Sequence, residues 1–211
     1  MTEGLTLYVD ANFLSPYAMS AYVGLHEKGL PFDLVRIDLG AREQHASPYA
    51  AVSLTRRVPA LAHGEFHLSE SSAITEYLEE RFPAPAHAAL YPQDIELRAK
   101  VRQIQAWLRS DLTPLRQERT TEVVFRGQQA KPLSEAAAAA ATKLFTVGTA
   151  LLQHGNQNLF GAWSIADADF ALMLNRLVRN GDEVPAQLAD YARLQWQRAS
   201  VLAWIGLGQA S

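Results

Sequence analysis

Ser15 lies where the first predicted strand is followed by a helix, a position at which a hydroxyl group can take part in chemistry. The first backbone N–H groups of a helix have no partner within the helix and carry a partial positive charge. This environment lowers the pKa of a thiol from about 8.5 to roughly 3.5–7.5, and a nearby hydroxyl can donate a hydrogen bond to the thiolate. Two roles are therefore open to Ser15: a plain N-cap, or a contact to a reactive sulfur.

The chain has 211 residues and no cysteine, so a thiol at this position must be brought in by a ligand. The lack of cysteine excludes disulfides, thiolate metal sites, iron–sulfur clusters and a cysteine nucleophile in the protein. His63 and His67 lie across an expected hairpin, and no carboxylate completes a ligand set with them. We therefore expect no metal site.

A second polar group, Ser69-Glu70-Ser71-Ser72, stands at the start of a predicted helix. It suits a ligand with both a carboxylate and an amine, because N–H groups and a hydroxyl bind the first and Glu70 the second. A helix start with several capping residues is the other interpretation. Earlier in the chain, a cis Val58-Pro59 bond would open the Val58 backbone to a ligand, but the sequence alone does not support a cis bond.

The elements that position these groups alternate between strand and helix in the first 82 residues. The first helix begins at Ser15-Pro16 and stops at Gly29, and a short helix and loop are expected over residues 41–52. Strands are predicted at 5–9, 32–37, 59–62 and 66–68, and a last helix at 71–82. This order implies a parallel crossover and a mixed sheet with helices on its faces.

Prolines 83 and 85 mark a predicted linker over residues 83–93, and residues 94–211 are predicted to be helical throughout. An apolar stripe runs over 97–115, where Pro114 should kink or end the helix. Six consecutive alanines favour a helix within 133–154, and two further helical stretches are predicted at 164–179 and 186–205. The prediction is an α/β domain over 1–82 and an all-helical domain over 94–211.

The bulk composition is typical of a soluble globular protein, with 48% hydrophobic and 19% charged residues. The formal net charge is −3, and without a basic excess we expect no binding to nucleic acid or to anionic lipid. The first residues are acidic rather than basic, and no apolar stretch has the length of a signal peptide or a membrane span. We therefore expect a cytoplasmic protein.

The stretches "LTLYVDANFLSPYAMSAYV", "RRVPAL" and "LSESSAITEYLEERF" together resemble the glutathione-binding domain of glutathione S-transferases. In the second half, "NLFGAWSIADADFALM" resembles the buried helix of that family, which starts with a Ser-x-x-Asp capping box, here Ser164 with Asp167. The resemblance covers essentially the whole chain. It is closest to bacterial YfcF-type glutathione transferases in "RRVPAL", "LSESSAI", "RQIQAWLRSDL" and "NRLVRNGDEVP". It implies a thioredoxin-like α/β domain followed by an all-α domain.

The resemblance also implies roles for individual residues. Ser15 matches the hydroxyl that hydrogen-bonds the sulfur of glutathione. Tyr8 is its rival, because some classes of the family place a catalytic tyrosine near the end of the first strand. We prefer Ser15, since the Ser-Pro helix start is present and a tyrosine in "TLY" can equally be a core residue. Tyr17 and Tyr22 are lesser candidates, for which packing is the expected role.

The other matched positions are implied to bind the rest of glutathione. Val58 matches the residue whose backbone pairs with the cysteinyl part, and Pro59 matches the cis proline. Glu70 and Ser71 match the pair that holds the γ-glutamyl group. Arg57 stands where a polar residue often lies near the glycyl carboxylate, although a surface arginine fits the position almost as well.

The implied activity is transfer of glutathione, as co-substrate, to a small apolar electrophile whose pocket the helical domain shapes. Its thiolate would attack carbon or a peroxide oxygen, which would add a glutathione-dependent peroxidase activity. The family also implies a homodimer. The alternative is a non-catalytic binding or scaffolding module of the same fold. The set of Ser15, Val58, Glu70 and Ser71 favours the enzyme.

Overall fold

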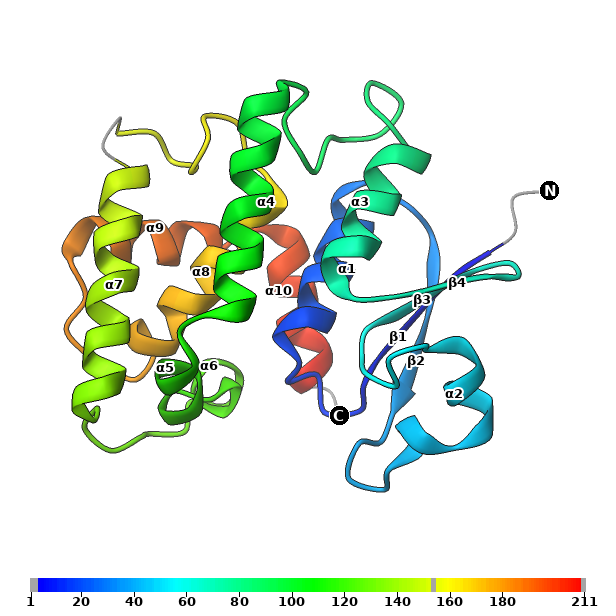
Figure 1. Ribbon diagram of the computed structural model, residues 1–211, viewed down its shortest axis with the longest axis horizontal. Coiled ribbons are helices and arrows are strands. Elements are labelled where there is room, and N and C mark those ends of the chain that lie inside the picture. Colours follow the sequence, from blue (N-terminus) through cyan, green and yellow to red (C-terminus); the bar gives the residue numbers. More distant parts are fainter. Residues whose placement is uncertain (1–3, 153–154, 210–211) are drawn as a thin grey trace. The chain divides into compact units, whose positions relative to one another are not determined.

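The computed structural model describes residues 4–152 and 155–209, and it divides the chain into two compact units (Figure 1). The first unit comprises residues 1–90 together with 202–211, and the second comprises residues 91–201.

A four-stranded mixed sheet is the centre of the first unit, with strand order β2-β1-β3-β4. Strand β1 (Leu5–Asp10) pairs in parallel with β2 (Phe32–Ile37) and antiparallel with β3 (Ala60–His63). Strand β4 (Phe66–Ser69) completes a hairpin with β3. The predicted strands, the parallel crossover and the hairpin are thus confirmed, each strand to within one residue at either end.

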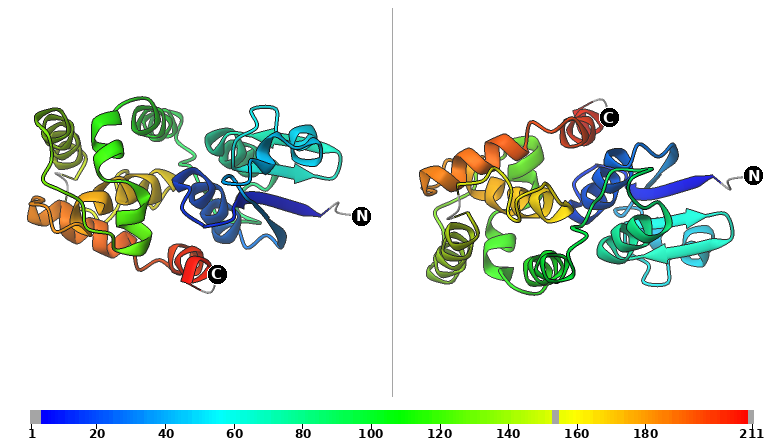
Figure 2. Two further views of the ribbon diagram at one scale, coloured as in Figure 1. Left: turned by 90° about the horizontal axis from the view of Figure 1, so that it is seen from below. Right: turned by 90° about the horizontal axis from the view of Figure 1, so that it is seen from above.

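Helices cover both faces of this sheet (Figure 1, Figure 2). Helices α1 (Pro16–Glu27) and α3 (Ser71–Arg81) pack against each other on one face, where Gly24 allows a close approach to Thr75. The short 3₁₀ helix η1 (Glu43–His45) and α2 (Ser47–Val52) lie toward the other face. Because successive strand residues point to opposite faces, Leu7 and Val9 are buried, whereas Tyr8 packs against α2.

The C-terminal helix α10 (Ala199–Gln209) belongs largely to this first unit, although the sequence grouped it with the helical half. Its fully buried Trp204 packs edge-on against Phe13 and in a tilted arrangement against Tyr22, with ring centroids 5.3 and 5.4 Å apart. The sequence also predicted one helical stretch over 186–205. The chain instead breaks at residues 196–198, between α9 and α10, where neither glycine nor proline marks the break.

The second unit contains helices and one isolated bridge, between Phe160 and Ala162, among its described residues. Its helices are α4 (Ile95–Ser110), α5 (Thr113–Glu118), α6 (Thr121–Arg126), α7 (Glu135–Leu151), α8 (Ile165–Val178) and α9 (Ala186–Gln195). As predicted, the apolar stripe is interrupted before Pro114, which is the second residue of α5. Helix α6 was not predicted. It is a short helix whose C-cap is Gly127.

Helix α8 forms the core of the second unit, since 12 of its 14 residues are buried. Ser164 and Asp167 make the capping box at its start. The Asp167 carboxylate accepts the backbone N–H groups of Ser164 and Leu159, both at 2.8 Å, and the Tyr191 hydroxyl at 2.9 Å. Burial raises the pKa of Asp167, while these hydrogen bonds oppose the rise. The box therefore fixes the entry of α8 into the core.

Candidate functional site

The register of the sheet brings three predicted segments to one end of it. Tyr8 of β1 pairs with Ala60 of β3, and Ala60 pairs with Ser69 of β4. The end of β1, the beginning of β3 and the end of β4 therefore lie side by side. The predicted site residues follow or precede these strand ends, namely Ser15 after β1, Arg57, Val58 and Pro59 before β3, and Glu70 and Ser71 after β4.

Ser15 is the N-cap of α1, with Pro16 as the first helical residue. Its Oγ accepts the backbone N–H of Ala18 at 3.2 Å, so the predicted capping role is confirmed. A serine hydroxyl has one proton and two acceptor lone pairs, and capping uses only a lone pair. Within the described residues the Ser15 proton is engaged in no hydrogen bond, so it is available to a ligand.

Asp10 fixes the turn that leads into Ser15. Its buried carboxylate accepts the N–H of Leu14 at 2.6 Å and the N–H of Ser15 at 3.0 Å. Phe13 adopts a positive φ of 54° within the same turn, so the backbone here depends on these bonds. Sequence reasoning missed this residue. The available signal was an aspartate directly after a strand, which commonly bonds the backbone a few residues on.

Tyr8 lies within a packed cluster on the α2 face of the sheet. Its ring is tilted against that of Tyr49, with centroids 5.6 Å apart, and Tyr8 and Val58 both pack against the cluster that contains Tyr49. Helix α1 packs with α3 on the opposite face (Figure 1). Tyr22 is buried against Phe32, so its expected packing role is confirmed, and burial raises its pKa.

The segment before β3 is held through its backbone. The Val58-Pro59 bond is cis, as is Ala84-Pro85, which sequence reasoning did not consider. The Arg57 carbonyl oxygen accepts the Tyr49 hydroxyl at 2.6 Å and the Ser53 hydroxyl at 3.1 Å. The side chain of Arg57 is exposed, and Val58 is half-buried. Burial raises the pKa of Tyr49 to about 12.

Glu70 and Ser71 form the start of α3. Glu70 has φ +72° and ψ 118°, a conformation that costs a non-glycine residue about 1–3 kcal/mol. Its side chain is exposed, while Ser71 is buried and is the first helical residue. Strained backbone of this kind is concentrated at ligand-binding and active sites. Glu70 therefore places a carboxylate at the N-terminus of α3. Contacts with neighbouring residues must hold its backbone in the strained conformation.

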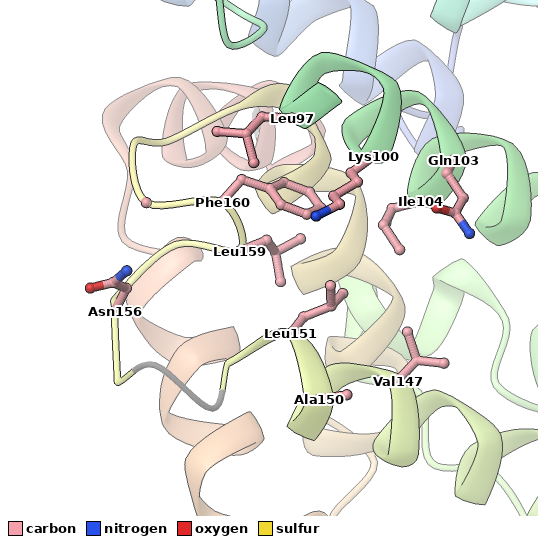
Figure 3. A pocket seen from close by; sticks show the side chains of 11 residues that line it. Leu97, Lys100, Gln103, Ile104, Val147, Ala150, Leu151, Asn156, Leu159 and Phe160 are labelled. Carbon is pink, nitrogen blue, oxygen red and sulfur yellow. The ribbon is translucent and has the colours of Figure 1, made fainter. Parts of the chain in front are cut away.

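A separate cavity of about 650 Å³ lies in the second unit, between α4, α7 and the segment before α8 (Figure 3). Most of its walls are aliphatic or aromatic, including Leu97, Ile104, Val147, Leu151, Leu159 and Phe160, and Lys100 is the charged side chain among the described lining residues. None of the residues predicted to bind glutathione lines it, so it is distinct from that set.

Two properties of the described residues bear on the class of site. Over residues 4–152 and 155–209, histidines and carboxylates form no group of three or more that could hold a metal ion. Within the same residues, no helix combines the length and the apolar character that a membrane crossing requires.

Comparisons with known proteins identify both halves of the chain. Residues 13–86 match the family model for the glutathione S-transferase N-terminal domain, and residues 94–210 match that for the C-terminal domain. Mouse glutathione S-transferase theta-3 is 38% identical over 133 residues, which are 61% of this chain and 54% of the mouse protein. Human glutathione S-transferase theta-1 is 36% identical over 109 residues, which are 52% of this chain and 44% of the human protein. The chain thus spans about half the length of the curated relatives it matches.

Solved structures match along nearly the whole chain. A glutathione transferase homolog from Burkholderia gl BGR1, solved with bound glutathione, is 47% identical, with a TM-score of 0.83. That match covers 99% of this chain and 100% of the Burkholderia chain. Poplar glutathione transferase F1 is 23% identical, with a TM-score of 0.76 over 99% of both chains, and this second likeness concerns the fold alone.

Proposed function

Because the chain belongs to the glutathione S-transferase family and has its fold, we propose that it is an enzyme that transfers glutathione to small apolar electrophiles. The thiolate sulfur of glutathione forms a bond to an electrophilic carbon, and the leaving group departs with its electron pair. The thiol proton goes to solvent before the attack. The observation that carries the proposal is the 47% identity, over 99% of this chain, to a homolog that was solved with glutathione bound.

Ser15 is proposed to donate its hydroxyl proton to the bound thiolate. Its capping bond leaves that proton unused, and the N-terminus of α1 adds the field of its unpaired N–H groups. Each unit by which the thiol pKa falls corresponds to 1.36 kcal/mol, so about two units suffice to ionise most of the thiol at pH 7. Tyr8 is the less suitable donor, because it packs against Tyr49 on the sheet face opposite α1.

The remaining residues at this end of the sheet are proposed to bind the rest of glutathione. The backbone of Val58, preceding Pro59, pairs with the cysteinyl part. Glu70 and Ser71 hold the γ-glutamyl amine and carboxylate, which suits a carboxylate beside a hydroxyl and helix N–H groups. Arg57 pairs with the glycyl carboxylate, and its exposed side chain is free to reach a ligand.

The same thiolate is proposed to attack the oxygen of an organic peroxide as well. That step releases an alcohol and converts the thiolate of glutathione to a sulfenic acid. A second glutathione then reduces the sulfenic acid, which forms glutathione disulfide and water. We also assign the chain to the YfcF-type bacterial subgroup and expect a homodimer. These assignments are supported by the stretches "RRVPAL" and "NRLVRNGDEVP" and by the family resemblance.

Turnover tests the proposal against a non-catalytic binding module. The purified chain is mixed with glutathione and a chloronitrobenzene, an alkyl halide or cumene hydroperoxide, and product is followed against an enzyme-free control. We expect conjugation that saturates with glutathione and falls strongly in Ser15→Ala. Tight glutathione binding by calorimetry without turnover of any of the three compounds would favour the binding module instead.

A further inference from the structure

A chain of buried hydroxyl groups connects the two backbone segments that flank the start of β3 and the end of β4. Ser53 Oγ lies 3.1 Å from the Arg57 carbonyl oxygen and 3.2 Å from Ser69 Oγ. The Tyr49 hydroxyl donates to the same Arg57 oxygen at 2.6 Å. All three side chains are buried, Ser53 completely.

The directions of these bonds follow from proton counting. A carbonyl oxygen only accepts, so Ser53 must donate its single proton to Arg57. The contact between the two serines must then use the proton of Ser69, with Ser53 as acceptor. The result is one directed chain, from Ser69 through Ser53 to the Arg57 carbonyl. Such chains are strengthened cooperatively in a buried environment.

The two ends of this chain are adjacent to the proposed ligand contacts. The Arg57 carbonyl belongs to the peptide unit that joins Arg57 to Val58, and Ser69 directly precedes Glu70. Ser53 directly follows α2 and lies 16 residues before Ser69, so its hydroxyl joins the segment before β3 to the end of β4. Glu70 itself has a strained backbone, which needs support from its neighbours.

We propose that Ser53 and Ser69, with Tyr49, are positioning residues that hold the Val58 segment and the Glu70–Ser71 segment at the spacing glutathione requires. The inference rests on the proposed function, because it takes these segments as the two halves of the glutathione site. None of the three hydroxyls contacts the ligand in this account. Their contribution is to keep the empty site in the geometry of the complex, which lowers the cost of binding.

The test measures glutathione affinity and stability together for Ser53→Ala, Ser69→Ala and the double variant. Calorimetry gives the Kd for glutathione, steady-state kinetics give KM and kcat, and a thermal melt gives Tm. We expect each single variant to raise Kd and KM by roughly 3–10-fold, the range for loss of one hydrogen bond. The kcat at saturating glutathione should change less than about 2-fold, since the removed interaction affects binding only.

Coupling provides the second readout. Because one bond joins Ser53 to Ser69, the double variant should raise Kd much less than the product of the single effects. Ser69→Thr keeps a hydroxyl at the end of a strand and should retain wild-type Kd. Tyr77→Phe is the control: the Tyr77 hydroxyl bonds His63 Nδ1 at 2.7 Å, at the opposite end of β3. This control should lower Tm without raising Kd.

The outcomes separate this inference from the function on which it rests. A wild-type protein that binds no glutathione would overturn both. The hydroxyls would be merely structural if the wild type binds glutathione and the single variants have a lower Tm but the wild-type Kd. That result would leave the proposed function intact. Multiplicative effects of the two serine variants would also overturn the proposed chain.

Discussion

The carboxylate of Asp10 accepts the backbone N–H of Ser15 at 3.0 Å and thereby fixes the end of β1 to the start of α1. A second bond, from Leu14 at 2.6 Å, holds the intervening turn. Two hydrogen bonds therefore position Ser15: its backbone N–H donates to Asp10, and its side-chain Oγ accepts the N–H of Ala18. No described residue accepts the Ser15 hydroxyl proton, which therefore lies available at a helix N-terminus. This proton is the core of the proposed mechanism.

The first prediction concerns Asp10. Asp10→Ala should lower the free energy of unfolding by about 3–6 kcal/mol, because it removes two hydrogen bonds to a charged group, each worth roughly 1.5–3 kcal/mol. Asp33→Asn, at an exposed position of β2, is the control and should change stability by less than about 0.5 kcal/mol. Urea unfolding measures both. Equal stability of the two variants would contradict the role given to Asp10.

The second prediction concerns a buried ion pair between the C-cap of α1 and helix α3. Lys28 Nζ lies 2.8 Å from Glu79 Oε2 and donates to the carbonyls of Phe82 and Ala88, and both charged side chains are at most 2% exposed. Lys28→Met leaves Glu79 as an uncompensated buried charge, so we expect a loss of roughly 3–5 kcal/mol. Replacing Glu79 by Leu in the same variant should recover part of that loss.

The control for the ion pair is the exposed pair of Arg193 and Asp190, whose side chains are 62% and 75% exposed. Arg193→Met should cost at most about 1 kcal/mol, because exposed pairs contribute little. Denaturant midpoints measure all these variants. A Lys28→Met protein as stable as Arg193→Met would refute the assigned role of Lys28.

The third prediction uses the titration of Tyr49, whose pKa burial raises to about 12. Because the pKa of Tyr49 is higher in the folded state than in the unfolded state, the neutral phenol stabilises the folded protein. This stabilisation is fully present below pH 10, the ordinary pKa of tyrosine, and is lost as the pH rises through about 12. Wild type should therefore lose stability more steeply than Tyr49→Phe between pH 10 and 12. Chemical unfolding at several pH values gives the two slopes, and parallel slopes would rule out this titration.

The fourth prediction separates strain from binding at Glu70. Glu70→Gly removes the strain of φ +72°, which costs about 1–3 kcal/mol. The greater freedom of glycine in the unfolded chain offsets roughly 0.5–1 kcal/mol of that gain. We expect unchanged or increased stability together with at least a 10-fold higher glutathione KM. Glu70→Gln keeps the strain and should raise KM without any gain in stability. A Glu70→Gly protein with wild-type KM would remove Glu70 from the ligand site.

Much of this architecture is readable from local sequence signals. Ser15-Pro16 specifies a helix start by capping and by the fixed φ of proline, and the structure has both features at that point. Ser164 and Asp167 likewise have the three-residue spacing of a capping box, and they form one. Such signals involve residues a few positions apart, so no tertiary information is needed.

The missed features depend on contacts between distant residues. The bond between Ser53 and Ser69 joins the residue after α2 to the last residue of β4, 16 positions along the chain. The break before α10 has no glycine or proline, and the burial of Trp204 against Phe13 places that helix with the first unit. Neither pairing is visible in a window of neighbouring residues. The roles of individual residues toward glutathione stay predictions.

The fifth prediction concerns the two uses of Ser15. Ser15→Ala loses the cap and should lower the free energy of unfolding by about 0.5–2 kcal/mol. It also loses the hydroxyl donor, so kcat/KM should fall by roughly 10²–10³, the effect of deleting one donor to a developing anion. Ser15→Thr keeps a hydroxyl in both roles and should retain a large part of stability and activity. Urea unfolding and steady-state kinetics on the same preparations separate the two losses.

The most direct measurement is the ultraviolet absorbance of the thiolate in the glutathione complex, titrated against pH for wild type, Ser15→Ala and Tyr8→Phe. Wild type and Tyr8→Phe should show the same depressed thiol pKa, because Tyr8 packs against Tyr49 and not at the helix start. Ser15→Ala should raise that pKa toward the value of free glutathione. A shift in Tyr8→Phe with none in Ser15→Ala would assign the sulfur contact to the tyrosine and leave Ser15 as a cap only.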